Sequence, residues 1–121
     1  MSFERLAGYI YPLFRFVFGC LFLIHGLQKF GLFGGRFVPL LSRLGAAAVI
    51  EVVCGPLIAV GAFTHIAAFV ASGEMAFAYF LQHAPRAFWP IQNGGEYAVL
   101  YCFAFLYVAA RGAGRFGFDQ R

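Results

Sequence analysis

Charged residues are scarce in this chain. Asp, Glu, Lys and Arg make up 12% of its 121 residues, well below the roughly 25% that is usual in soluble proteins. Because 62% of the residues are hydrophobic and 15 more are glycine, too little polar surface remains to cover a core in water. The composition therefore excludes an ordinary water-soluble catalytic domain and indicates a protein surrounded by lipid.

The chain also lacks basic runs and cysteine motifs. Its nine Lys and Arg give a net charge of +4, but they are dispersed, unlike the basic clusters that bind nucleic acid. Cys20, Cys54 and Cys102 lie far apart in apolar stretches and form no C-x-x-C pair. We therefore expect no nucleic-acid partner, no disulfide framework and no metal site.

Long apolar stretches are present instead, and the mean hydropathy is +0.79. A membrane-spanning helix needs about 20 residues, so this length holds four helices with short connections. The predicted spans are residues 9–30, 46–63, 66–82 and 94–111. We predict one all-α membrane domain over residues 1–121, an antiparallel bundle of four transmembrane helices.

The connections carry glycine and proline. Thr64 and His65 predict a very tight turn, which makes the second and third spans an antiparallel hairpin. After the first span, several glycines stop the helix. The stretch that follows, around Pro39, contains Arg36 and Arg43. We expect this stretch to be a short amphipathic segment at the membrane interface.

Four spans place both termini on one side of the membrane, here called side one, and the two long loops on side two. The basic residues other than Arg15 divide evenly, when Lys29 and Arg111 at the ends of their spans are included. Side one has Arg5, Arg111, Arg115 and Arg121, and side two has Lys29, Arg36, Arg43 and Arg86. The excess of basic residues that normally marks the cytoplasmic side is therefore absent, and the orientation stays open.

Ionisable residues within the spans are the main functional signal, because a charge at a helix centre costs about 3 kcal/mol. His25, Gln28 and Lys29 have i, i+3 and i+4 spacing, which places them on one helix face near side two. Glu51 and Glu96 enter their spans from the same side. We predict that Lys29 pairs with Glu51 or Glu96 at this depth.

Further polar residues belong to the same predicted cluster or to a second one. Tyr79 is expected to add a hydrogen bond, as are His25 and Gln28, while His83 and Asn93 border the mouth of the cluster. Arg15 and Glu74 lie at matched depths nearer the midplane, so we predict that they form a separate pair. Stripes of small residues flank Glu51 and Glu74 and predict that both acids face neighbouring helices.

Four short motifs occur in order along the chain. They are R-x-x-x-G from Arg15, H-G-x-x-K from His25, E-x-x-x-G from Glu51 and F-W-P-x-x-N-G-G-E from Phe88. In combination they resemble the DoxX family of four-helix membrane proteins, and the resemblance extends over nearly the whole chain.

The resemblance implies a multi-pass protein of the bacterial inner membrane, acting as an accessory subunit of a quinone-linked redox complex that handles thiosulfate or thiols. By analogy the polar cluster binds a quinone headgroup, with Lys29 or His25 donating to a carbonyl and Glu51 or Glu96 relaying the proton. The sequence has no haem-ligand pair, iron–sulfur spacing or flavin fingerprint, and we expect no covalently bound cofactor. A redox role therefore requires a protein partner.

Two other functions remain open. The protein is a small proton-coupled transporter if Glu74 is the titrating group and a homo-oligomer forms the path. It is an assembly or scaffold factor without chemistry if Lys29, Glu51 and Glu96 only fix the helix arrangement as a buried ion-pair network.

Overall fold

The computed structural model describes residues 2–39 and 41–119. Met1, Leu40, Gln120 and Arg121, the last of which counts among the basic residues of side one, lie outside the described residues. The helices are α1 (Phe3–Gln28), α2 (Arg43–Val60), α3 (Thr64–Ala78), one π-helical turn (Tyr79–His83), α4 (Pro90–Asn93) and α5 (Glu96–Arg111). The all-α prediction is confirmed: within the described ranges the only β pairing is an isolated bridge between Phe30 and Phe37.

Capping residues set several helix ends. The Ser2 side chain accepts a hydrogen bond from the Arg5 N–H at 3.2 Å and caps the start of α1. Ser42 caps α2 in the same way, accepting from the Gly45 N–H at 3.1 Å. Gly61 ends α2 with a φ of 76°, a left-handed conformation that glycine adopts at little cost. These caps explain why α1 and α2 begin earlier than residues 9 and 46, the predicted starts.

Three helical segments are long and apolar enough to cross a membrane. They are Phe3–Gln28, Arg43–Val60 and Thr64–His83, the last combining α3 with its π-helical turn. The fourth predicted span corresponds to α5, which has only 16 residues. At 1.5 Å per residue it is about 24 Å long, shorter than a hydrocarbon core of about 30 Å. The structure therefore shows three membrane-capable helices, and the fourth crossing stays a prediction.

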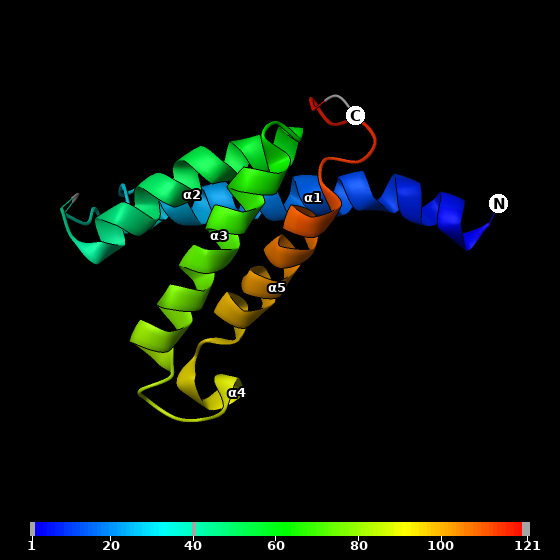
Figure 1. The fold of residues 1–121 in the computed structure, drawn as a ribbon. Helices are drawn as coiled ribbons and strands as arrows, with labels where there is room; N and C mark the ends of the chain where they lie inside the picture. Colours follow the sequence, from blue (N-terminus) through cyan, green and yellow to red (C-terminus); the bar gives the residue numbers. More distant parts are fainter. Residues whose placement is uncertain (1, 40, 120–121) are drawn as a thin grey trace.

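The long helices form two antiparallel pairs, α1 with α2 and α3 with α5 (Figure 1). The two pairs cross at a wide angle and do not lie side by side as in a regular four-helix bundle (Figure 1). The first turns of α1 project beyond the rest of the molecule, and the C-terminal segment lies over the end of α2 (Figure 1).

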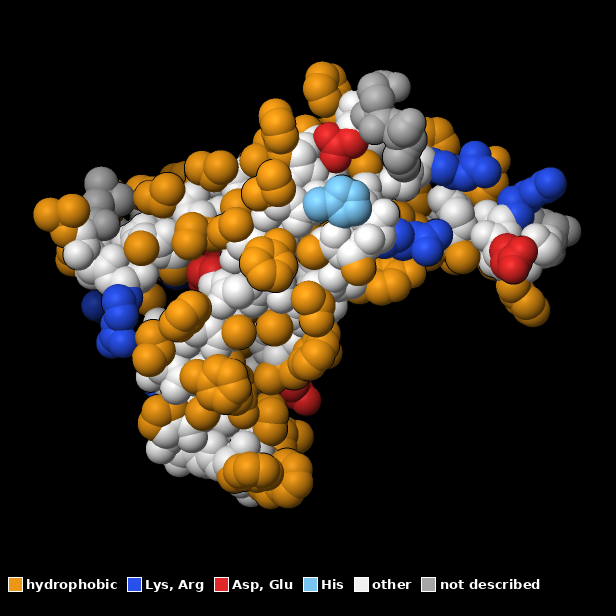
Figure 2. Space-filling model, in the orientation of Figure 1, with side chains coloured by type: hydrophobic (Ala, Val, Ile, Leu, Met, Phe, Trp, Pro, Cys, Tyr) orange, Lys and Arg blue, Asp and Glu red, His pale blue; other side chains and the backbone are white. Residues whose placement is uncertain are grey.

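Glycines allow α1 and α2 to approach closely. A Cβ atom on Gly19 of α1 would lie 2.5 Å from the backbone nitrogen of Ala59 in α2. A Cβ on Gly55 would lie 2.8 Å from the Leu23 nitrogen. Such backbone contact is the usual way to pack helices in lipid, where no hydrophobic driving force holds them together. Hydrophobic side chains are spread over much of the face that Figure 2 shows.

The amphipathic segment predicted after the first span forms turns, and its place at the membrane interface stays a prediction. The described residues between α1 and α2 form turns and contain no helix. Gly31 and Gly34 have positive φ angles of 90° and 78°, and the Val38 N–H donates to the Lys29 carbonyl at 2.9 Å. The loop therefore folds back on the end of α1. Arg43 is the first residue of α2.

The tight turn predicted at Thr64 and His65 lies a few residues earlier in the structure. The turn is Gly61–Phe63, and Thr64 already begins α3. Asp119, from the C-terminal segment, accepts hydrogen bonds from the N–H groups of Phe63 at 2.8 Å and Thr64 at 3.0 Å. This carboxylate satisfies the free donors at the start of α3. Because the cap comes from 55 residues away, no local pattern reveals it.

Candidate functional site

A cavity of about 640 Å³ lies between α2 and α3, and residues of α1 and α5 close its other sides. Its walls are mainly apolar, with Phe22, Ile50, Phe69, Val70 and Phe77 among them. Several ionisable side chains line the same cavity. These are His25, Lys29, Arg43, Glu51, Glu74 and His83. A hydrophobic cavity with a few polar groups is the usual form of a small-molecule site.

Lys29 and Glu51 form an ion pair at this cavity. The Lys29 Nζ lies 2.8 Å from Glu51 Oε1, and the two side chains are 22% and 1% exposed. Gly26, one turn before Lys29, makes the approach possible, since a Cβ there would lie 2.8 Å from the Glu51 Cβ. A buried carboxylate that kept no cationic partner would be strongly destabilising. Of the two partners predicted for Lys29, the structure selects Glu51.

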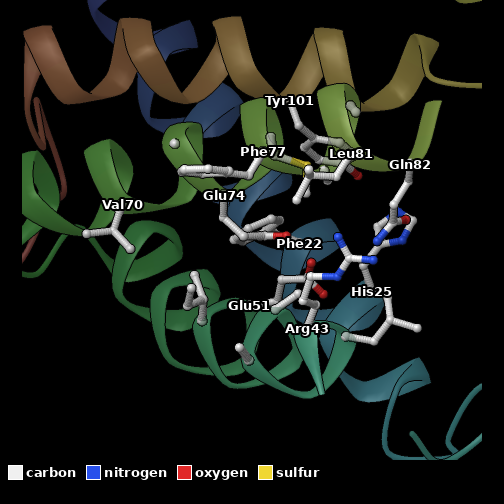
Figure 3. A pocket seen from close by; sticks show the side chains of 18 of the residues that line it. Phe22, His25, Arg43, Glu51, Val70, Glu74, Phe77, Leu81, Gln82 and Tyr101 are labelled. Atoms are coloured by element: carbon white, nitrogen blue, oxygen red, sulfur yellow. The ribbon is translucent and has the colours of Figure 1, made fainter. Parts of the chain in front are cut away.

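Glu74 of α3 joins this pair from the opposite wall. Figure 3 shows its carboxyl group pointing toward Glu51. The Oε1 atom of Glu74 is buried and has no hydrogen-bond partner among the described residues. The predicted pair of Arg15 and Glu74 is therefore wrong, because Glu74 belongs to the group formed by Lys29, Glu51 and Glu74, here called the charged triad.

Arg15 lies against the C-terminal end of α2, does not line the cavity and is only 2% exposed. Its Nη1 donates to the carbonyls of Ile58 at 2.9 Å and Ala59 at 2.6 Å, and its Nε donates to Ala113 at 2.9 Å. The last carbonyls of a helix lack intrahelical partners and carry partial negative charge. Backbone carbonyls of α2 and of the C-terminal segment therefore act as the hydrogen-bond acceptors of Arg15, in place of the predicted carboxylate.

The two other polar residues predicted on α1 have separate positions. His25 lines the cavity and stands edge-on to Tyr101, with ring centroids 5.5 Å apart. Gln28 donates to the Phe33 carbonyl at 3.4 Å, so it holds the following loop. The predicted hydrogen bond from Gln28 to the cluster is wrong because the loop folds back onto this side chain.

Tyr79, His83 and Asn93 form a separate hydrogen-bonded group that joins the π-helical turn to the loop before α5. Asn93 is 1% exposed, and its Nδ2 donates to the Tyr79 hydroxyl at 3.0 Å. Its Oδ1 accepts from the Gly95 N–H at 2.8 Å, and its own carbonyl lies 3.2 Å from His83 Nδ1. The hydrogen bond predicted from Tyr79 to the cluster is therefore wrong. His83 alone among the three also lines the cavity.

Glu96 is exposed and begins α5. It is absent from the cavity lining, and Lys29 is already paired with Glu51. The alternative pairing of Lys29 with Glu96 is therefore wrong. The preceding Gly95 packs on the Tyr79 ring, which a Cβ atom at Gly95 would meet at 2.7 Å. The start of α5 therefore lies against the π-helical turn, with Glu96 outside the cavity.

Sequence reasoning brought Gln82 to this depth but missed three other polar cavity residues. Gln82 lines the cavity from the π-helical turn, and Tyr97 and Tyr101 line it from α5. Arg43 extends into the same space near Glu51 and His25 (Figure 3). A signal for Arg43 existed, since Arg43, Ala46, Ala47 and Ile50 all line the cavity and have the i, i+3, i+4, i+7 spacing of one helix face.

The three cysteines are all free thiols. Cys54 is buried, and Cys20 and Cys102 are partly buried. Cys102 lies 3.5 Å from the Ser72 hydroxyl, which also donates to the Cys102 carbonyl at 2.8 Å. Among the described residues, no group of three or more His, Cys, Asp and Glu is arranged to hold a metal ion.

Comparison with known proteins identifies the family of this chain. Residues 11–84 match the DoxX family model. An uncharacterized protein of Haemophilus influenzae is 39% identical over 126 residues, which cover 98% of this chain and 94% of that relative. No solved structure gives a significant match. Since the family match covers more than half of the chain and includes three of its long helices, the chain belongs to the DoxX family and is a multi-pass membrane protein.

Proposed function

We propose that this protein is an accessory subunit of a redox complex in the bacterial inner membrane, and that its cavity binds the headgroup of a quinone. The observation that carries the proposal is the charged triad at an apolar cavity of about 640 Å³. Ionisable groups held inside a membrane protein at such expense are functional candidates by default. The Haemophilus relative is consistent with a bacterial membrane.

The cavity suits a quinone in size and character. Its volume falls within the roughly 300–1,000 Å³ that is typical of small-molecule pockets. Phe69, Val70 and Phe77 line it and are 66%, 40% and 71% exposed, so a lipid-soluble tail has a route to the bilayer. Arg43 and His25 offer N–H donors to ring oxygens. When bound, a quinone supplies the reversible two-electron, two-proton chemistry that amino-acid side chains lack.

The chain's own residues then have distinct tasks. Lys29 fixes the Glu51 carboxylate through the 2.8 Å ion pair. The apolar walls keep water from the charged triad, which strengthens its electrostatic interactions. Glu74 faces Glu51 and lines the cavity, so its carboxyl group is placed to hold or move a proton. Electrons come from a partner subunit, because the sequence lacks haem, iron–sulfur and flavin motifs.

The test is purification from membranes in mild detergent, followed by extraction and chromatographic quantification of quinone. We expect wild type to retain quinone and Lys29→Met or Glu51→Gln to lose about tenfold, since removing a charged hydrogen-bond group typically costs about 1.4 kcal/mol or more. Glu96→Gln is the matched control outside the cavity and should behave as wild type.

A folding control is needed because Lys29→Met leaves Glu51 buried and unpaired. The double variant Lys29→Met/Glu51→Gln removes both charges together and should restore folding, as replacement of a buried ion pair by neutral groups often does. Folded double variant with undiminished quinone, or wild type that binds none even when quinone is added, contradicts the proposal.

A proton-coupled transporter is the second candidate, and the position of Glu74 favours it. This carboxyl group faces both Glu51 and the cavity, as a proton carrier must. In proteoliposomes, proton-driven flux that Glu74→Gln abolishes and Glu96→Gln leaves intact supports this function. Unchanged behaviour of all the variants in both assays, with a partner protein still co-purifying, leaves the assembly or scaffold function.

A further inference from the structure

The charged triad contains one base and two acids. Lys29 neutralises Glu51 across 2.8 Å. Arg43 also lines this cavity, but among the described residues no ion pair joins it, or any other cation, to the Glu74 carboxyl. Two carboxyl groups that face each other inside a protein repel when both are ionised, and a shared proton relieves that repulsion. The triad is therefore electrically neutral only when Glu51 and Glu74 together hold one proton.

A proton shared between the two acids accounts for the hydrogen bond that Glu74 lacks. Glu74 Oε1 is buried and receives no hydrogen bond from the described residues, although the Glu74 carboxyl points toward Glu51 (Figure 3). A buried polar atom without a partner is rare and costly. A proton on Glu74 that is donated to Glu51 removes this cost, and it leaves the second Glu74 oxygen, Oε2, as an acceptor for whatever occupies the cavity.

An acceptor at the polar end of an apolar cavity discriminates between ligands. A quinone carbonyl is also an acceptor, so opposite Glu74 Oε2 it makes no hydrogen bond and leaves both oxygens desolvated. A hydroquinone hydroxyl donates to the same atom. Arg43 and His25, which also line the cavity, can donate a hydrogen bond to either form, because both forms have oxygen lone pairs. Glu74 is thus the group that separates the two forms.

We infer that this cavity selects the reduced, hydroquinone form of its ligand, with the ligand hydroxyl donating to Glu74 while Glu74 shares its proton with Glu51. The inference rests on the proposed function, and it adds the redox form that the site takes. It requires only a binding step, so no electron or proton leaves the protein.

The experiment is equilibrium binding to purified wild-type protein in nanodiscs, measured anaerobically by calorimetry. Three probes share one short isoprenoid tail: a benzoquinone, its hydroquinone and the hydroquinone dimethyl ether, which keeps the shape but has no hydroxyl. We expect the hydroquinone to bind at least about tenfold more tightly than the quinone, and the ether to bind as weakly as the quinone.

Two substitutions at Glu74 test the shared proton. Glu74→Gln imitates the protonated acid, since its amide N–H can donate to Glu51 while its carbonyl oxygen faces the cavity, so the preference should persist. Glu74→Leu has a similar size but no acceptor, and the preference should fall to about twofold or less. Glu96→Leu is the control outside the cavity and should keep the full preference.

The outcomes separate the two proposals. Equal binding of quinone and hydroquinone, or an ether that binds as tightly as the hydroquinone, overturns the inference and leaves the quinone site standing. A preference that survives Glu74→Leu overturns it as well. Failure of all three probes to bind wild-type protein overturns the proposed function itself. The probe series on wild type decides the matter even where a variant fails to fold.

Discussion

Arg15 shows how a single buried cation can hold distant segments together. Its guanidinium donates to Ile58, Ala59 and Ala113, so it joins the end of α2 to the segment that follows α5. The nearby Tyr11 hydroxyl donates to the Gly112 carbonyl at 2.6 Å. Several carbonyls that no water reaches depend on this one planar group.

Substitution of Arg15 should therefore destabilise the protein strongly. Arg15→Lys keeps the charge but replaces the planar fork by a single ammonium, and we expect a loss of about 3 kcal/mol because buried carbonyls lose their donors. Arg15→Ala should cost more. Thermal unfolding in detergent measures both, with the exposed Arg5→Lys as control; wild-type stability of Arg15→Lys would show that the fork is dispensable.

Asp119 contributes a pH-dependent contact outside the membrane-spanning segments. The Thr64 hydroxyl donates to its carboxylate at 2.7 Å, as do the N–H groups of Thr64 and Phe63. These hydrogen bonds, first that of the Thr64 hydroxyl, lower the pKa of Asp119 below 3.8, and nearby His65 acts in the same direction. A lowered folded-state pKa stabilises the fold fully above pH 4, and the contribution is lost as pH falls through the folded value.

We expect this cap to contribute about 1 kcal/mol, the usual value for a helix N-cap, because solvent screens a carboxylate this exposed. The difference in unfolding free energy between wild type and Asp119→Asn should shrink between pH 5 and about pH 3. Glu4→Gln, at an exposed position of α1, corrects for general acid effects. A difference that does not change with pH would show that the carboxylate charge has no part in the cap.

At the scale of the helices, glycine spacing decides which surfaces meet. Gly19, Gly26 and Gly55 all lie where a Cβ would touch backbone or side-chain atoms of the partner helix at under 3.0 Å. Gly73, on α3, has nothing within 4 Å of its would-be Cβ. Glycine therefore permits close packing between α1 and α2, whereas Gly73 of α3 has no such role.

This contrast gives a matched pair of substitutions. Gly19→Ala should destabilise the α1–α2 pair by about 1–3 kcal/mol, because the added methyl meets the backbone of Ala59 and backbone cannot move aside cheaply. Gly73→Ala should be neutral or stabilising by up to about 1 kcal/mol, through helix propensity alone. Denaturant unfolding in detergent compares them. Equal effects of the two substitutions would contradict the close packing of α1 on α2.

The predicted helices and the observed ones agree best where hydrophobicity is continuous. The three membrane-capable helices cover most of the first three predicted spans, because long apolar runs have few alternatives to a helix in lipid, even with Pro12 and Pro56 inside two of them. The loops were predicted less well. Their form depends on long-range contacts, such as Asp119 on Thr64 and Arg15 on Ala113, that no local window contains.

For the whole molecule, α5 decides the topology. It packs along α3 from end to end: His65 Nδ1 lies 2.6 Å from the Ala109 carbonyl at one end, and Gly95 packs on the Tyr79 ring at the other. If α3 crosses the bilayer, α5 therefore crosses with it. Short helices of this kind are accommodated by thinning of the bilayer or by flanking polar residues that reach the interface.

Cysteine labelling in intact cells tests this fourth crossing. The background is a variant in which Cys20, Cys54 and Cys102 are replaced by Ala. A membrane-impermeant thiol reagent should reach Glu4→Cys and Phe116→Cys from one side of the membrane, and Leu32→Cys and Arg86→Cys from the other. Labelling of Phe116→Cys together with Arg86→Cys would mean that α5 does not cross.

The sequence by itself determined that this chain lies in lipid, that it is helical, and that Lys29 has an acidic partner. These properties follow from composition, from the periodicity of side chains and from the cost of an unpaired charge in a membrane. All three are the same for every possible packing of the helices. The four motifs also identified the family, which the match over residues 11–84 confirmed.

Only the tertiary structure decided which partners meet. Depth along a helix follows from residue number, but the direction of a side chain around the helix axis depends on which face packs on the neighbour. Glycine contacts set that rotation, so Glu74 turned toward Glu51 and Arg15 toward the carbonyls of α2. The charged triad and its cavity exist because helices distant in sequence approach closely at small residues, which is a property of the packed molecule.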